Sequence, residues 1–125
     1  MILILDAHVL LWWWADDRRL GPPARRSITN PEHSVVVSAA TVWEIAVKRA
    51  AGRLSAPANI LETLQSEQFD VVPITGEDAV SAAELPLHHR DPFDRLLISQ
   101  AMRLDALIIT SDRAISAYEA NVLPA

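Results

Sequence analysis

The sequence predicts an α/β sandwich in which helices flank a mostly parallel central sheet of four to five strands. Short apolar or β-branched runs alternate along the chain with longer segments of helical character, the pattern of repeated strand–helix–strand units. The chain has 125 residues and 50% hydrophobic content, enough to bury about two thirds of its unfolded surface. It contains only 3 Gly and no repeat or linker, so we expect residues 1–125 to form a single domain.

In the first half of the chain we expect two strands and three helices. Residues 1–5 are an uninterrupted apolar run that ends before an acid, typical of a strand buried on both faces. A short helix over 8–15 follows, and a Gly-Pro-Pro break opens the next helix. The β-branched residues 34–37 favour a second strand. Ser38 can then cap a helix that extends to about residue 51.

The second half alternates in the same way. We expect helices over 57–68, 75–84, 91–104 and 112–119, and strands over 69–74, 107–110 and 121–123. Pro73 favours an edge position for its strand. Thr75 and Asp78 have the spacing of a capping box, and Asp91 followed by a proline is a typical helix start. In parallel sheets of this kind, functional sites form beyond the carboxyl ends of the strands.

Composition and charge narrow the class of protein. The chain has 11 basic and 16 acidic side chains and a net charge of -5. This balance speaks against a polybasic nucleic-acid binder, although a nucleic-acid enzyme whose acids hold a metal remains compatible with it. The absence of cysteine excludes disulfides and fits a cytoplasmic location. The apolar stretch over residues 1–15 is interrupted by Asp6 and His8 and is too short to span a membrane, so we expect no membrane partner.

Acidic side chains fall where this layout brings strand ends together. Asp6 follows the first strand, Asp112 follows the strand over 107–110, and Asp91 and Asp94 lie in the first turn of the helix before it. Glu44 is the only charged residue of its apolar stretch, and burying a lone carboxylate is costly. A hard cation such as Mg²⁺ or Mn²⁺ takes oxygen ligands and would satisfy these acids together. Such a cation can activate water for phosphodiester hydrolysis.

Most of these acids also have a purely structural explanation. Asp6 and Asp112 could cap the helices that follow them. Asp91 and Asp94 could stabilise the start of their helix. Glu44 is least explained in this way, because a solvated helix face would carry other charges beside it. The joint placement of the acids, rather than any one of them, indicates a metal site.

Four separated motifs occur in order along nearly the whole chain: ILILDAHVLLWW at 2–13, SAATVWEIAVK at 38–48, DPFDRLLISQA at 91–101 and ITSD at 109–112. Together they resemble PIN-domain proteins of the VapC toxin type. The resemblance implies a PIN-like three-layer fold and a Mg²⁺-dependent or Mn²⁺-dependent endoribonuclease. It further implies a toxin that cleaves cellular tRNA, rRNA or mRNA and inhibits translation until a cognate antitoxin of the VapB or Phd type neutralises it. We expect a homodimer or a toxin–antitoxin hetero-oligomer.

The resemblance also implies roles for individual acids. Asp6, Glu44 and Asp94 match the three core acidic positions of the family, and Asp112 matches the fourth, more variable one. We expect all four to be catalytic. In this hypothesis Asp6 and Asp94 bind the metal directly, Glu44 binds it directly or through water, and Asp112 orients water or holds a weaker second metal. Asp91 belongs to an Asp-Pro-Phe-Asp-Arg signature, for which we expect a role behind the ligands or at the substrate.

The sequence departs from the family pattern at Ala7, where relatives commonly carry a threonine or serine. The hydroxyl that would face the site there is missing from this chain. We expect Thr110, Ser111 or water to supply it.

Arginines flank the predicted site. Arg90, Arg95 and Arg113 are candidates for RNA contacts, because the planar guanidinium suits phosphate oxygens. They could equally be surface or ion-pairing arginines. Of the three, Arg95 is our candidate for a substrate contact.

Three consecutive tryptophans, Trp12, Trp13 and Trp14, lie in the first predicted helix. Consecutive helical residues point about 100° apart, so the three rings spread over about 200° and cannot all enter one core. At least one should lie at an edge or be exposed, which favours an interface with the antitoxin or a second copy. We expect His88 and His89 to be ordinary loop residues.

Two other functions are compatible with parts of the sequence. A phosphoaspartyl-type phosphatase also carries an acid after its first strand, but His8 stands where the dehalogenase-like motif requires a second aspartate, and Glu44 is left without a role. A non-catalytic PIN-like module that binds RNA or a partner is the other alternative. Metal-dependent RNA cleavage would distinguish the nuclease from this module.

Overall fold

The computed structural model describes all 125 residues and is built on a five-stranded sheet in the order β3-β2-β1-β4-β5. The strands are β1 (Ile2–Leu5), β2 (Ser34–Ser38), β3 (Asp70–Val72), β4 (Leu107–Thr110) and β5 (Asn121–Pro124). Every neighbouring pair is parallel. The predicted mostly parallel sheet of four to five strands is therefore confirmed, including the edge position of the strand that precedes Pro73.

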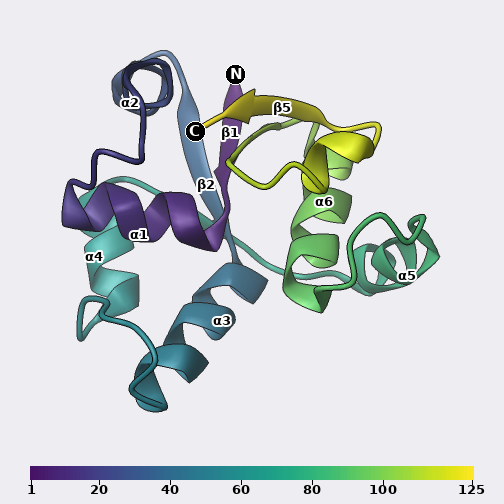
Figure 1. Ribbon diagram of the computed structural model, residues 1–125, viewed down its shortest axis with the longest axis horizontal. Coiled ribbons are helices and arrows are strands. Elements are labelled where there is room, and N and C mark those ends of the chain that lie inside the picture. The colour runs from purple at the N-terminus through teal and green to yellow at the C-terminus, as the bar shows by residue number, and fades with distance from the viewer.

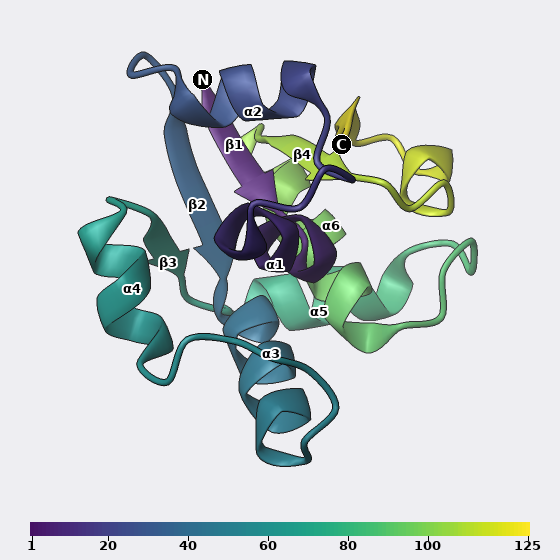
Figure 2. The ribbon, with the colours of Figure 1, turned by 60° about the vertical axis from the view of Figure 1, so that its left-hand side comes forward.

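Six helices and one short turn cover the sheet. They are α1 (Ala7–Ala15), α2 (Pro22–Thr29), α3 (Ala39–Ala50), α4 (Ile60–Ser66), α5 (Gly76–Glu84), α6 (Pro92–Leu104) and the 3₁₀ turn η1 (Ile115–Ala117). Figures 1 and 2 show α1, α2 and α4 on one side of the sheet and α5 and α6 on the other. No helix has the combination of length and apolarity that crossing a membrane requires.

Two hydrophobic cores separate the three layers. Leu3 and Leu5 of β1 pack in the core beneath α1, α2 and α4, whereas Ile4 between them packs against α6. Successive side chains of a strand point to opposite faces, so a strand that is covered on both sides must be apolar throughout. This explains the uninterrupted apolar run at the start of the sequence.

Two helices are shorter than the sequence predicts. The helix expected over 57–68 begins only at Ile60, where Asn59 accepts the backbone N–H of Glu62 and caps the first turn. The helix expected over 112–119 is reduced to η1. Its start is diverted because the Asp112 side chain accepts the backbone N–H of Ala114 only two residues ahead, a local turn that competes with helix formation.

The strand order creates a crevice at the carboxyl ends of β1 and β4. The chain proceeds from β1 through β2 to β3 on one side of the sheet, and the remaining strands β4 and β5 lie on the other. Leu5 of β1 pairs with Ile109 of β4 at the point where the strand order reverses. Ligands of open α/β sheets bind beyond the strand ends at such a point, and Asp6 and Asp112 follow the two strands that meet there.

Candidate active site

Asp6 is the buried acid at the end of β1. Its side chain is the N-cap of α1, where Oδ1 accepts the backbone N–H of Val9 at 2.8 Å. Its Oδ2 accepts the hydroxyl of Thr110. Burial raises the pKa of Asp6, and these two hydrogen bonds oppose that rise. The cap explains the position of one oxygen, and the other faces the end of β4.

Thr110 ties the two central strands together at the crevice. Besides donating to Asp6, its hydroxyl oxygen accepts the backbone N–H of Asp112 at 3.0 Å. Thr110 is buried, whereas Ser111 is exposed. Of the side chains expected to replace the hydroxyl missing at Ala7, Thr110 is therefore the one that contacts a site acid.

Asp94 and Asp112 converge from α6 and from the loop after β4. Asp94 Oδ2 lies 3.0 Å from His89 Nε2, and Asp112 Oδ2 lies 2.7 Å from the same nitrogen. Burial raises the pKa of Asp94 from its usual 3.8 to about 7, and the charge of Asp91 adds to the effect. Near neutral pH Asp94 is therefore only partly ionised.

Glu44 is buried on α3, as its apolar surroundings predict. Its Oε2 lies 2.6 Å from Nζ of Lys48, one helical turn later. The required partner of this acid is thus present within the chain. The charge of Glu44, like that of Asp6, also raises the pKa of Asp94, so α3, β1 and α6 direct their acids toward one region.

The donor set at this region fits a hard divalent cation. One atom each of His89, Asp94 and Asp112 lies within 4.8 Å of the others, and Asp6 is close enough to influence Asp94 electrostatically. The acids of this group offer carboxylate oxygens, the ligands that Mg²⁺ and Mn²⁺ prefer. Burial, and after it the charges of the neighbouring acids, raise the pKa of Asp94, and a bound cation would offset both effects.

Asp91 is the N-cap of α6, as the structural explanation of this motif predicts. Its Oδ1 accepts the backbone N–H of Phe93 at 2.8 Å. Its charge nevertheless raises the pKa of Asp94. Asp91 therefore both stabilises the helix and tunes the site, and its role toward substrate stays a prediction.

Arg95, our candidate for a substrate contact, is buried and hydrogen-bonded within the chain. This residue is 8% exposed. Its guanidinium donates to backbone carbonyls in the last turn of α5 and in the connection that follows, among them Ala82 at 2.7 Å, Leu85 at 2.7 Å and Pro86 at 3.0 Å. Both terminal nitrogens of the guanidinium are thus taken up by backbone carbonyls within the chain, which leaves only Nε–H without a partner. Sequence spacing does not reveal this, since the acceptors lie about three helical turns upstream.

None of the three consecutive tryptophans is fully exposed. Each is partly buried against the core beneath α1, which agrees with the expectation that the rings cannot all be interior. Trp13 and Trp14 donate their indole N–H groups to the two carboxylate oxygens of Glu67, at 2.6 and 2.8 Å. Their polar edges are thus engaged within the chain, and an interface role for these rings stays a prediction.

Two residues of the site region escaped the sequence analysis. Trp43 on α3 is 63% exposed and stands edge to face with Phe93, with ring centroids 5.3 Å apart. His89 is not an ordinary loop residue, because its imidazole lies between Asp94 and Asp112. Their positions in the sequence could have indicated them, because Trp43 is next to Glu44 and His89 is two residues before Asp91.

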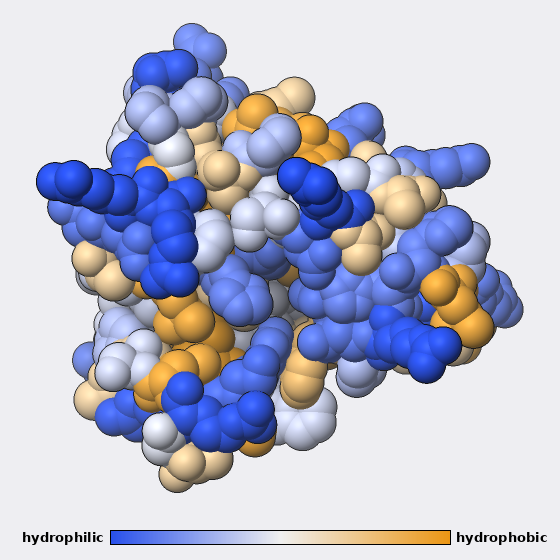
Figure 3. Space-filling model, in the orientation of Figure 1, coloured by the Kyte–Doolittle hydropathy of each residue, from blue (hydrophilic) through white to orange (hydrophobic).

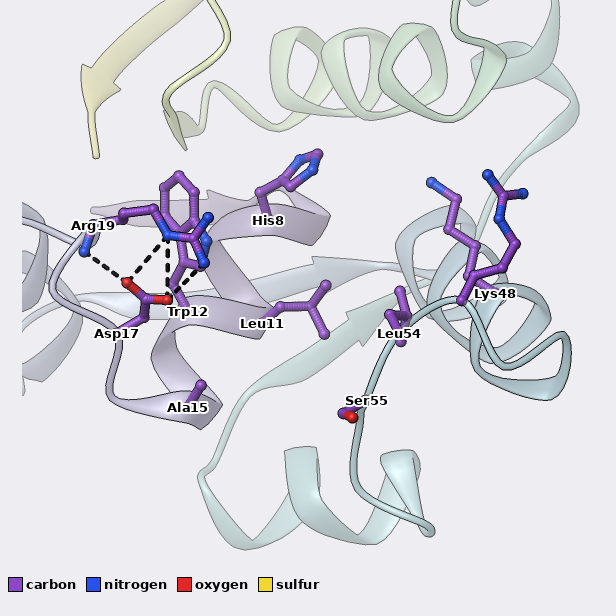
Figure 4. Close-up of a pocket in the computed structure, with 10 residues that line it drawn as sticks. His8, Leu11, Trp12, Ala15, Asp17, Arg19, Lys48, Leu54 and Ser55 are labelled. Atoms are coloured by element: carbon purple, nitrogen blue, oxygen red, sulfur yellow. Dashed lines mark hydrogen bonds and ion pairs between the residues drawn. The ribbon is translucent and has the colours of Figure 1, made fainter.

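A cavity of about 410 Å³ lies between α1 and the end of α3, and Lys48 on its wall pairs with Glu44. Figure 4 shows His8, Trp12 and Arg19 on one wall and Lys48 and Leu54 on the other. Arg53 and Ser55 also line it. Figure 3 shows apolar atoms exposed between α1 and α3 with hydrophilic side chains around them. We call this cavity the basic groove, because it carries three cationic side chains against one acid, Asp17.

Known proteins resemble this chain in sequence or in fold. The profile of the PIN domain family matches residues 3–121. Ribonuclease VapC22 of Mycobacterium tuberculosis is 30% identical over 119 residues, which cover 93% of this chain and 91% of that protein. The chain also superposes on two solved structures at low sequence identity, which shows a shared fold.

The first of these is VapBC2 from Rickettsia felis bound to a promoter DNA fragment. Its TM-score is 0.68 at 13% identity, over 99% of this chain and 98% of that one. The second is a toxin–antitoxin complex from Klebsiella pneumoniae, with a TM-score of 0.68 at 14% identity over 97% and 95% of the two chains.

Proposed function

Since the chain belongs to the PIN domain family, we propose that it is a metal-dependent endoribonuclease and the toxin of a toxin–antitoxin pair. One observation carries the proposal: Asp6 and Glu44, which come from two other elements, lie near enough to Asp94 that their charges add to the effect of burial in raising its pKa to about 7. The 30% identity to a mycobacterial ribonuclease supports RNA as the substrate. A phosphoaspartyl phosphatase would leave this convergence unexplained.

In this proposal the residues divide the work at the scissile phosphodiester. Asp6 and Asp94 would hold the cation directly, Glu44 would hold it directly or through water, and Asp112 would orient water. A divalent cation bound there lowers the pKa of water and stabilises charge on the phosphate. Mg²⁺ is the expected ion and Mn²⁺ the alternative, because the donors are mainly carboxylates.

The chain's own contacts prepare the acids for this task. Thr110 and the first turn of α1 fix both oxygens of Asp6, so this acid enters the reaction already oriented. Lys48 neutralises Glu44 and lies on the wall of the basic groove. Lys48 thus contacts a site acid and would also contact RNA in the groove, which links substrate binding to the acids.

The basic groove is the proposed path of the RNA strand toward the acids. Arg19 is paired with Asp17 and Lys48 with Glu44, whereas Arg53 makes no ion pair in this structure. Cations in the groove explain how a chain with a net charge of -5 can bind a polyanion. Arg53 takes the place of Arg95 as our candidate for a phosphate contact.

The proposed partner is a cognate antitoxin of the VapB or Phd type. The solved structures that share the fold include complexes of toxins with antitoxins. The partly exposed rings Trp12, Trp13 and Trp14 remain the proposed contact surface. Trp43 beside the site is 63% exposed and is a further aromatic that a partner would cover.

Purified chain should cleave RNA when Mg²⁺ or Mn²⁺ is present and should stop when EDTA is added. The measurement is the appearance of discrete fragments from a mixed RNA substrate on a denaturing gel. Asp6→Asn provides the matched inactive protein, which excludes a contaminating nuclease. Cleavage that persists in EDTA, or in Asp6→Asn, would contradict the proposed chemistry, and RNA binding without cleavage would favour the non-catalytic module.

Charge reversal in the basic groove should weaken RNA binding without disturbing the acids. For Arg53→Glu we expect KM for RNA to rise several-fold and the dependence of binding on salt concentration to become shallower, because fewer counterions are released. Fluorescence anisotropy of a labelled RNA at several salt concentrations measures both. Arg26→Glu, an exposed substitution on α2 outside the groove, is the control. Equal slopes for the two variants would remove Arg53 from the RNA path.

A further inference from the structure

His89 is the site residue that the proposed mechanism leaves without a role. It lies in the connection between α5 and α6, and its side chain is 15% exposed. Its Nε2 is 2.7 Å from Asp112 Oδ2 and 3.0 Å from Asp94 Oδ2. One imidazole nitrogen thus contacts two carboxylates that come from different parts of the chain.

The other ring nitrogen determines where the imidazole proton lies. The backbone N–H of Asp91 donates to Nδ1 of His89 at 3.1 Å, so Nδ1 presents a lone pair. In the neutral ring the proton is then on Nε2, which faces Asp94 and Asp112. His89 therefore donates its Nε2–H to Asp112, and the same nitrogen lies 3.0 Å from the Asp94 carboxylate. Protonated in this way, Nε2 has no lone pair with which to bind a metal.

Buried groups hold the His89 backbone in this place. Its N–H donates to the hydroxyl of Tyr118 at 2.8 Å, and its carbonyl accepts from Arg95 at 3.1 Å. Tyr118 also donates to the carbonyl of Pro86 at 2.6 Å. Arg95 and Tyr118 are both buried. The connection is thus anchored to the interior on both sides of His89, and the position of the ring follows from this scaffold.

We propose that His89 is a positioning residue that holds Asp94 and Asp112 together for the cation, an inference that rests on the proposed function. Two carboxylates that share a site repel each other, and a fixed N–H between them offsets this repulsion and orients their oxygens. Hydrogen bonds to ligating groups commonly change metal affinity by about 10-fold to 100-fold. His89 acts through the acids and is not itself a ligand.

The direct test is the affinity for Mn²⁺ alone, measured by calorimetry and by electron paramagnetic resonance without RNA. His89→Ala should bind Mn²⁺ about 10-fold or more weakly. His89→Gln keeps a side-chain N–H donor and should recover most of the affinity. Leu87→Ala, at an exposed position of the same connection, should match the wild type. Thermal unfolding of each variant in EDTA verifies that the protein is folded. Pulsed electron paramagnetic resonance of the wild type should detect no nitrogen bound directly to Mn²⁺.

Each other outcome overturns a defined statement. Tighter Mn²⁺ binding by His89→Ala would mean that the imidazole competes with the cation, and unchanged binding would mean that it does not position the acids. A directly bound nitrogen would make His89 a ligand. Asp94→Asn separates this inference from the proposed function. If both His89→Ala and Asp94→Asn bind Mn²⁺ like the wild type, the proposed metal site itself is wrong. If Asp94→Asn loses Mn²⁺ binding and His89→Ala keeps it, only the role of His89 is refuted.

Discussion

Replacing Asp94 with asparagine should lower the rate of RNA cleavage by about 100-fold or more, because the substitution removes a proposed metal ligand. Loss of a hydrogen bond to a metal ligand already lowers activity by up to about 100-fold, and loss of the ligand itself should cost at least as much. Asparagine keeps the shape of the side chain and lacks the charge. The measurement is the initial rate of cleavage at saturating Mg²⁺. Asp105→Asn is the matched control, since Asp105 ends the same helix in a left-handed conformation that asparagine also adopts. A rate within a few-fold of wild type would contradict the assignment of Asp94.

The same substitution should have the opposite effect on stability in the absence of metal. The folded protein holds the Asp94 proton with a pKa of about 7, compared with the usual 3.8, so between about pH 4 and pH 7 it binds more protons than the unfolded chain. Stability of the metal-free protein must then fall as pH rises through this window and level off above it. Asp94→Asn should flatten this dependence and raise stability near pH 7.5.

Urea unfolding in EDTA between pH 4 and pH 8 measures this effect. Burial also raises the pKa of Asp6, so Asp6 contributes in the same direction and a part of the slope will remain in Asp94→Asn. Added Mg²⁺ should stabilise the wild type at pH 7.5, because ligands that bind only the folded state stabilise it, and should stabilise the variant much less. A pH slope that is the same in both proteins would show that Asp94 is not the buried acid.

Replacing Arg95 with methionine should destabilise the protein by about 3 kcal/mol or more, because each buried carbonyl left without a donor costs about 1–3 kcal/mol. The guanidinium donates to the carbonyls of Ala82, Leu85 and Pro86, and methionine fills similar space without a donor. Arg95→Lys should lose less, since a single ammonium can satisfy some of these acceptors. Urea unfolding measures the difference.

Arg90→Met is the control for this prediction. Arg90 is exposed, and surface substitutions away from specific contacts usually change stability by less than about 0.5 kcal/mol. If Arg95→Met unfolds like the wild type but raises KM for RNA, then Arg95 contacts substrate after all. Because Arg95 also holds the backbone of His89, we expect the destabilised variant to bind Mn²⁺ more weakly too.

Local rules account for the parts of the fold that the sequence predicts well. The capping box at Thr75 and Asp78 forms as predicted, and the α6 start at Asp91 and Pro92 does so as well. Gly52 adopts a positive φ of 71° just after α3. These features involve neighbours within one turn of chain, so the residues that determine them are adjacent in the sequence. The two shortened helices differ because side chains of Asn59 and Asp112 capture nearby N–H groups at their starts.

The sequence by itself determined the parallel sheet, the crevice at its carboxyl end and the acids placed there, because strand periodicity and the position of a residue after a strand are local properties. Only the tertiary structure decided which polar side chains are free to act. Arg95 turns inward because its acceptors come from another helix and its loop, and His89 faces the acids because Arg95 and Tyr118 hold its backbone. The partner of a buried polar group is chosen by long-range packing, and no local pattern encodes that choice.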